Sequence, residues 1–165
     1  EVNGYRFIAI VDLLVFQPPN KFLIMDWKTN YKRPTRKNLQ QHFQTRLYPF
    51  LLTKTGSPFH KDLNVQPDQI EMTYWFTNFP QESESFVYSA NQFQQDSDYF
   101  EGVVKTIQNQ IEFPKTDQVK RCAFCEYRSL CDRGTQAGNN VDLEDIDWQT
   151  PLDVLDFDQI GEIAF

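Results

Sequence analysis

The sequence predicts an α/β fold in which a mixed sheet is flanked by helices. Two pairs of apolar runs rich in β-branched and aromatic residues, each pair joined by a turn, predict two hairpins. Between and after these hairpins, two longer segments repeat their apolar residues with the helical period. A chain of 165 residues is long enough to bury one core, so these elements are expected in a single domain.

The first predicted hairpin spans residues 5–28 and turns at 18–20, where two prolines and an asparagine follow one another. Its apolar strands contain two acids, Asp12 and Asp26, and Lys28 follows Asp26 at position i+2. Because alternate residues of a strand share a face, Asp26 and Lys28 are expected side by side, with Asp12 brought towards them. Two carboxylates and a lysine can hold a hard divalent cation and orient a water molecule.

The alternative is that Asp26 and Lys28 form only an ion pair at a strand end. An acid-x-lysine triplet occurs about once by chance in a chain of this length, so the triplet alone carries little weight. The acids lie among apolar neighbours, however, and buried acids are costly unless they are paired or bind a metal. Since buried ion pairs rarely add net stability, we favour a functional site here.

The next predicted element is a helix over residues 35–53, with Thr35 as its N-cap and Gly56 just beyond its end. Pro49 is expected to kink this helix or to end its first half. The helix has an apolar face and, off that face, a second stripe at i, i+4 and i+8. The apolar face consists of Leu39, Phe43, Leu47, Phe50 and Leu51, and the second stripe of Gln40, Gln44 and Tyr48.

The order Asp12, Asp26-x-Lys28, Gln44-x-x-x-Tyr48 resembles the PD-(D/E)xK nuclease superfamily, in particular its RecB-like branch, which includes the CRISPR-associated RecB-type exonucleases. The resemblance covers residues 5 to 48. It implies a restriction-endonuclease-like mixed sheet flanked by helices. Members of that branch usually carry a helix with an acidic or histidine ligand before the first catalytic strand, so we interpret this chain as a fragment whose N-terminal part precedes Glu1.

The same resemblance implies roles for the individual residues. Asp12, Asp26 and the backbone carbonyl of Trp27 would hold Mg²⁺ or Mn²⁺. Lys28 would contact the attacking water molecule or the scissile phosphate. Gln44 and Tyr48 would position water or DNA.

Three late cysteines, Cys122, Cys125 and Cys131, form a C-x2-C-x5-C run. This run is similar to the C-terminal cluster of the iron–sulfur members of the same branch, in which a fourth, earlier cysteine completes a 4Fe-4S site. The chain has no fourth cysteine, although four thiolates are the usual requirement. Zinc and plain buried cysteines stay open as alternatives, and the zinc alternative would need His42 or His60 at an unusual spacing.

The charge distribution favours DNA as a partner in spite of a net charge of −7. Eight acids lie between 141 and 165, and the rest of the chain is close to neutral. Residues 28–61 hold eight basic residues and no acid, which suits a phosphate backbone, although a solvated helix face is the simpler alternative. We select as DNA-binding candidates Lys32, Arg33, Arg36, Lys37 and Arg46.

Residues 69–88 predict a second hairpin that turns at 80–82, and a helix capped by Ser89 is expected to run to about Phe113. The aromatic residues of this hairpin are expected in the core rather than stacked on bases. The apolar side of the helix is assigned to Phe93, Tyr99, Phe100, Val103, Val104, Ile107 and Ile111.

Composition divides the chain into a nuclease core with its cysteine cluster, residues 1–134, and a linker with an acidic, apolar-rich tail, residues 135–165. No apolar stretch approaches membrane-spanning length. The odd number of cysteines and the lack of a signal peptide point to a reducing, cytoplasmic compartment.

The resulting functional hypothesis is a metal-dependent DNA nuclease, exonuclease-like, acting in repair, recombination or defence with a helicase or another subunit of such a system. The alternative is a catalytically inactive nuclease-fold module that binds DNA or a partner protein.

Overall fold

The structure of the chain is a computed structural model that describes residues 2, 4–29, 31–59, 64–119, 122 and 125–134. The chain forms two compact units, Glu1–Glu112 and Phe113–Phe165. The first unit holds the sheet and the three α-helices. The acidic tail, residues 135–165, lies outside the described residues.

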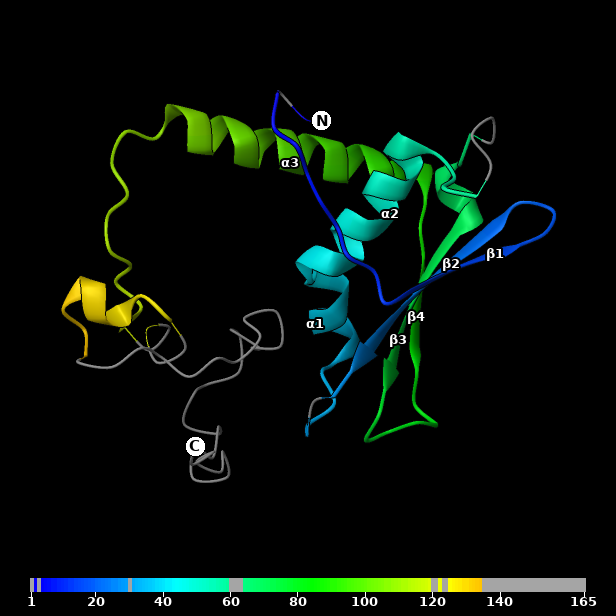
Figure 1. Cartoon of the computed structure of the whole chain (residues 1–165), viewed down its shortest axis with the longest axis horizontal. Coiled ribbons are helices and arrows are strands. Elements are labelled where there is room, and N and C mark those ends of the chain that lie inside the picture. Colours follow the sequence, from blue (N-terminus) through cyan, green and yellow to red (C-terminus); the bar gives the residue numbers. More distant parts are fainter. Residues whose placement is uncertain are drawn as a thin grey trace. The chain divides into compact units, whose positions relative to one another are not determined.

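The first unit contains a four-stranded mixed sheet in the order β1-β2-β3-β4. Strands β1 and β2 are antiparallel, β2 and β3 parallel, and β3 and β4 antiparallel, so the two predicted hairpins are confirmed and meet side by side (Figure 1). The chain crosses from β2 to β3 through two helices. The elements in order are β1 Leu13–Gln17, β2 Lys21–Lys28, α1 Arg36–Gln41, α2 Phe43–Thr55, η1 Pro67–Gln69, β3 Ile70–Phe76, β4 Glu84–Val87 and α3 Ala90–Asn109.

The first strand is shorter than the sequence predicts. Strand β1 begins at Leu13, which pairs with Met25, and residues 6–11 are extended without strand pairing. The next backbone donor of β2, the N–H of Trp27, donates to the Asp12 carboxylate at 2.8 Å. Because a side chain occupies the donor that a longer β1 would use, the ladder stops there and the chain before Asp12 turns towards the helices.

The predicted single helix is divided in two. Thr35 caps α1 by accepting the N–H of Asn38, and Gly56 ends α2 with a φ of 76°, both as predicted. The break falls at His42, whose backbone is extended, and α2 continues through Pro49, so the helix does not end at this proline. The Leu39 carbonyl accepts the backbone N–H of His42 at the end of α1, and the Thr45 hydroxyl donates to the same carbonyl across the break.

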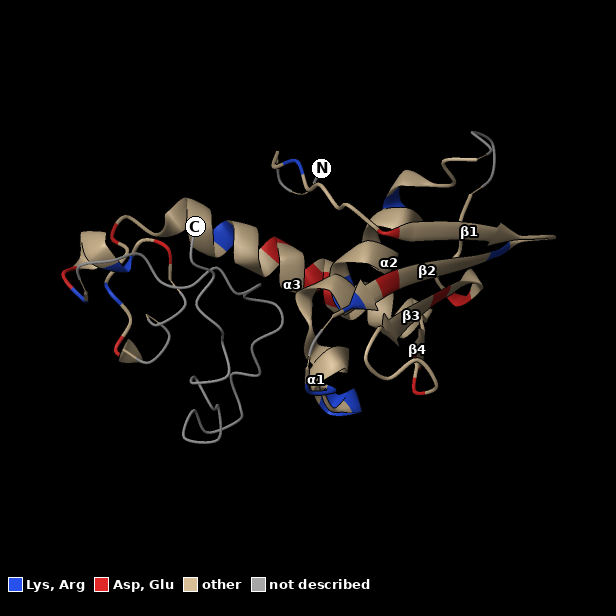
Figure 2. Cartoon of the chain, turned by 60° about the horizontal axis from the view of Figure 1, so that its bottom comes forward, with Lys and Arg blue, Asp and Glu red and all other residues tan. Residues whose placement is uncertain are grey.

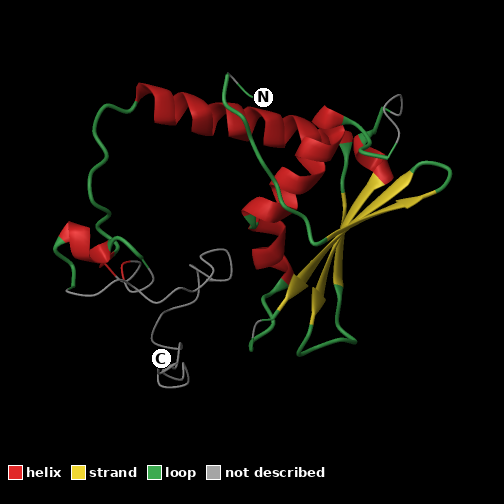
Figure 3. Cartoon of the chain, viewed as in Figure 1, coloured by secondary structure: helices red, strands yellow, loops and turns green. Residues whose placement is uncertain are grey.

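The core lies between the sheet and the helices, which cover one face of the sheet (Figure 3). Register places β2 side chains Phe22 and Ile24 beside Ile70 and Met72 of β3 on this face. All four side chains are buried. On the same face the next two residues of β2 in this alternation are Asp26 and Lys28, so the core pattern leads directly into the charged pair.

Helix α3 is held against the rest of the unit by a buried carboxylate. Asp96 is fully buried and accepts hydrogen bonds from Arg46 at 2.6 Å, Tyr88 at 2.9 Å and Gln92 at 3.0 Å. Burial, followed by the negative charge of Asp96, raises the pKa of the Tyr88 hydroxyl, so this group stays a donor over the whole physiological range.

The far end of α3 differs from its prediction. The helix ends at Asn109, before the expected Phe113. Phe100 and Val104 join the core, but Ile107 and Ile111 are 50% and 95% exposed. The helical period therefore identified the face of α3 that is buried at Phe100 and Val104. Ile107 is exposed near the end of the helix, and Ile111 lies beyond it.

None of the described helices has the length and apolar character that crossing a membrane would require.

The Asp96 cluster yields a test of how α3 is attached. Asp96→Ala leaves the Arg46 guanidinium without its buried partner, so the free energy of unfolding is expected to fall by about 3–5 kcal/mol. Urea denaturation followed by circular dichroism measures this. The matched control is Asp98→Ala on the exposed side of the same helix, where a change within about 0.5 kcal/mol is expected. An equal effect of the two changes would contradict the role of Asp96.

Candidate active site

The candidate site begins with two charged side chains on the covered face of β2. The residues Asp26 and Lys28 are 4% and 5% exposed, and the Lys28 ammonium lies 3.4 Å from the Asp26 carboxylate. Both follow the alternation of Phe22 and Ile24, as predicted. Lys28 is held at the strand end, where Thr77 donates its backbone N–H to the Lys28 carbonyl at 2.9 Å.

A line of hydrogen bonds extends from this pair onto helix α2. The Lys28 ammonium donates to the Gln44 side-chain carbonyl at 2.8 Å, and the Gln44 amide donates to the Tyr48 hydroxyl at 3.1 Å. The i, i+4 spacing of Gln44 and Tyr48 makes this contact possible. The structure thus joins Asp26, Lys28, Gln44 and Tyr48 in one polar network.

Tyr48 differs in one respect from its prediction. The sequence places it off the apolar face, but its side chain is 9% exposed and belongs to the core. Its ring packs while its hydroxyl faces Gln44, so truncation to alanine would damage the core as well as the polar network. Tyr48→Phe is therefore the change that separates the two contributions.

Asp12 also differs from its prediction. The sequence places it inside a buried strand, whereas it lies just before β1 and is exposed. Its carboxylate is nevertheless fixed, because it accepts the Trp27 N–H, and β1 pairing places it across from Asp26 at the end of the ladder. The hairpin thus brings Asp12 to the Asp26-Trp27-Lys28 segment, as expected.

Sequence reasoning missed a second pair beneath the site. Tyr74 of β3 is opposite Asp26, is fully buried, and has its hydroxyl 2.7 Å from the Thr45 hydroxyl of α2. The Lys28 ammonium lies 5.7 Å from the centre of the Tyr74 ring, a cation–π contact. The hydrogen bond between the Tyr74 and Thr45 hydroxyls fixes the position of α2 relative to the sheet. The polar hydroxyl of a tyrosine predicted for the core was the available signal, because such a group needs a buried partner.

The donor set fits a hard divalent cation. Asp12, Asp26 and the backbone carbonyl of Trp27 supply oxygen, the donor that Mg²⁺ and Mn²⁺ prefer, and the hydrogen bond from the Trp27 N–H holds Asp12 at the same residue. Within the described ranges, no three side chains of His, Cys, Asp or Glu gather in a metal-binding group.

The predicted DNA-binding residues fall into two groups. Lys32 and Lys37 are exposed, and basic residues gather at α1 (Figure 2). Three arginines instead make ion pairs within the unit. Arg33 and Arg36 both contact Glu84 of β4 at 2.5 Å, and Arg46 contacts Asp96.

The cysteines belong to the second unit. Cys122 is buried, while Cys125 and Cys131 are half-buried, and all three are free thiols. The Cys125 N–H donates to the Cys122 carbonyl at 3.3 Å, and Cys131 ends the short helix η3, Arg128–Cys131. Arg133 donates to the Cys122 sulfur at 3.2 Å. Among the described residues, the three cysteines do not gather into a metal-binding group.

A mixed sheet flanked by helices, with an acid-x-lysine pair at the end of its second strand, defines a restriction-endonuclease-like α/β fold. The chain belongs to the PD-(D/E)XK nuclease superfamily, whose family model matches residues 1–132. It has no significant match among curated proteins or among solved structures.

The Glu84 cluster yields a pH-dependent prediction. Burial raises the pKa of the Glu84 carboxyl, but hydrogen bonds from Arg36 and Arg33 outweigh it, so this pKa lies below its usual value of 4.5. A pKa that is lower in the folded state adds stability above the unfolded value, and this is lost as the pH falls through the folded value. Glu84→Gln is therefore expected to lower the unfolding free energy by about 1–2 kcal/mol at pH 7.

The same difference between wild type and Glu84→Gln is expected to vanish as the pH falls well below 4.5. Thermal melts of both proteins over a pH series measure it. A difference that stays constant down to acidic pH would show that the carboxylate charge is not what holds the two arginines.

Proposed function

We propose that this chain is a metal-dependent nuclease domain that hydrolyses phosphodiester bonds of DNA. The observation that carries the proposal is the ion pair between Asp26 and Lys28, extended by the hydrogen bond from Lys28 to Gln44, with Asp12 held by the N–H of the intervening Trp27. Membership of the nuclease superfamily supports the reaction class. The metal, the substrate and the individual roles are proposals built on the contacts of these residues.

Asp12, Asp26 and the Trp27 carbonyl are proposed to hold Mg²⁺ or Mn²⁺. Such an ion, when bound, neutralises phosphate charge and lowers the pKa of a water molecule. Lys28 donates hydrogen bonds as a compact positive charge, which suits contact with the attacking water molecule or a phosphate oxygen. Gln44 fixes the ammonium of Lys28 from the helix side, and the Tyr48 hydroxyl fixes Gln44.

The RecB-like branch and an exonuclease-like mode are finer proposals. The hydrogen bond between Gln44 and Tyr48 supports them, because it gives the Gln-x-x-x-Tyr pattern a direct link to Lys28. DNA contacts are assigned first to Lys32 and Lys37, because both residues are exposed. A helicase or another repair or defence subunit is the proposed partner, and a cytoplasmic location is proposed from the odd cysteine count.

The second candidate is a non-catalytic module that binds DNA or a protein. The observation that favours it is that the described part of the chain offers two carboxylates at the site and no third acidic or histidine ligand beside them. Catalysis and binding are separated by the following experiment.

Cleavage of single-stranded DNA is expected only with Mg²⁺ or Mn²⁺, and Asp26→Asn or Lys28→Met is expected to lower its rate by at least about 100-fold. Each change removes one charge from the network while keeping a similar shape. Metal-free protein and Lys105→Met, at an exposed helix position, serve as controls. Rates of both site variants equal to wild type would reject the assignment, and binding without any cleavage would favour the second candidate.

We propose further that Cys122, Cys125 and Cys131 ligate an iron–sulfur cluster or zinc when a fourth ligand is supplied. Their C-x2-C-x5-C spacing supports this, and so does the match of the family model up to residue 132. Metal binding couples to folding, so loss of one ligand is expected to release the metal and loosen residues 114–134.

Iron, sulfide and zinc analysis of purified protein, with Cys125→Ser and Ser129→Ala compared, tests this proposal. Wild type and Ser129→Ala are expected to retain the metal that Cys125→Ser loses. Absence of both iron and zinc from wild type, together with unchanged folding of Cys125→Ser, would make the cysteines ordinary packing residues.

A further inference from the structure

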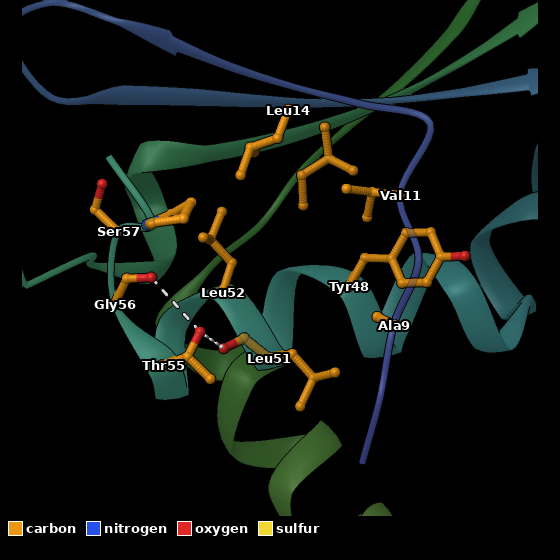
Figure 4. A pocket seen from close by; sticks show the side chains of 11 residues that line it. Ala9, Val11, Leu14, Tyr48, Leu51, Leu52, Thr55, Gly56 and Ser57 are labelled. Atoms are coloured by element: carbon orange, nitrogen blue, oxygen red, sulfur yellow. Dashed lines mark hydrogen bonds between the residues drawn. The ribbon is translucent and has the colours of Figure 1, made fainter. Parts of the chain in front are cut away.

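A cavity of about 300 Å³ opens beside the candidate site, between helix α2 and the extended segment before β1 (Figure 4). Its walls come from that segment, from β1 and β2, and from α2 with the loop that follows. The lining is mainly apolar and includes Ala9, Val11, Leu14, Ile24, Tyr48 and Leu51.

Tyr48 belongs both to this cavity and to the polar network. Its ring lines the cavity in Figure 4, while its hydroxyl accepts the hydrogen bond from Gln44. The cavity is also adjacent to the carboxylates in sequence: Val11 precedes Asp12, and Ile24 lies two residues before Asp26 on the same face of β2. Two residues of a strand span about 6.6 Å, so Ile24 in the cavity wall lies about this far along β2 from Asp26.

The volume and the lining of the cavity suit a largely apolar ring. Apolar side chains form most of its wall, and the Tyr48 ring is its aromatic part. At one end the Thr55 hydroxyl donates to the Leu51 carbonyl, and the Ser57 hydroxyl accepts the Phe59 N–H. A nucleobase has these properties, and stacking on an aromatic side chain tolerates any base. Continuity with the site through Tyr48 favours a base of the substrate over an unrelated apolar ligand.

We propose that this cavity binds one unpaired base of the DNA strand whose phosphate lies at Asp12 and Asp26. The inference rests on the proposed nuclease function and specifies its substrate. A base that enters the cavity must leave its stack and its pair, so the site selects single-stranded or frayed DNA. The cost of unpairing makes an intact duplex a poor substrate.

The first test uses wild-type protein and a series of single-stranded oligonucleotides with one abasic position moved along the strand. Cleavage at each bond is mapped on a sequencing gel. One base lost from an aromatic stacking site weakens binding by about tenfold or more. The cleavage map is therefore expected to show about tenfold suppression at one fixed offset from the abasic position. Suppression at no fixed offset, while cleavage continues, would overturn the base cavity and leave the nuclease assignment standing.

The second test fills the cavity and measures binding rather than cleavage. Ala9→Phe places a ring into the lining, and Ile8→Phe is the matched control, because Ile8 is 65% exposed and does not line the cavity. Leu51→Phe is a second filling variant in case Ala9→Phe melts early. Fluorescence anisotropy in Ca²⁺ compares an oligonucleotide with its fully abasic counterpart of equal length.

Wild type and Ile8→Phe are expected to bind the base-bearing strand about tenfold more tightly than the abasic strand, and the filling variants to lose most of this preference. An unchanged preference in both filling variants would overturn the proposal. If the filling variants lose the preference for the base-bearing strand but the wild-type protein never cleaves DNA, the base cavity would be supported and the nuclease function rejected.

Discussion

The buried pair of Asp26 and Lys28 is the constraint on which the rest of the first unit depends. Moving two charges out of water costs several kcal/mol per ion, and their mutual attraction offsets this only when further hydrogen bonds complete the geometry. Gln44 supplies one such bond to Lys28, and the Tyr74 ring lies beside the ammonium. The position of helix α2 relative to the sheet is therefore constrained, and the hydrogen bond between the Thr45 and Tyr74 hydroxyls fixes it.

The position of α2 is also fixed from its outer side. Arg46, between the residues that serve the site, reaches the buried carboxylate of Asp96 on α3. Helix α2 thus directs Gln44 towards β2 and Arg46 towards α3. Pro49 lies within the same helix and is buried. Arg46 therefore serves to attach α3, although the sequence alone would count it among the cations available to a phosphate backbone.

Periodicity and turn residues predicted the mixed sheet, both hairpins, the helix caps at Thr35 and Ser89, and the Asp26 and Lys28 pair, because these depend on local sequence. Three features depend on tertiary contacts and escaped prediction. Strand β1 begins only at Leu13 because the Asp12 carboxylate takes the next backbone donor of β2. The break at His42 is bridged by the Thr45 hydroxyl. Arg33 and Arg36 are paired with Glu84, which is distant in the sequence. A count of basic residues cannot reveal such partners.

The hydrogen bond from the Trp27 amide to Asp12 has a consequence for how the Asp26-x-Lys28 pattern can vary. The residue at x takes part through its main chain, while its side chain points to the opposite face of the sheet and is 46% exposed. Nineteen of the twenty genetically encoded residues carry this amide, so the position tolerates almost any side chain and excludes proline alone. At position x of the motif, the side chain can therefore vary, whereas the backbone N–H has to be present.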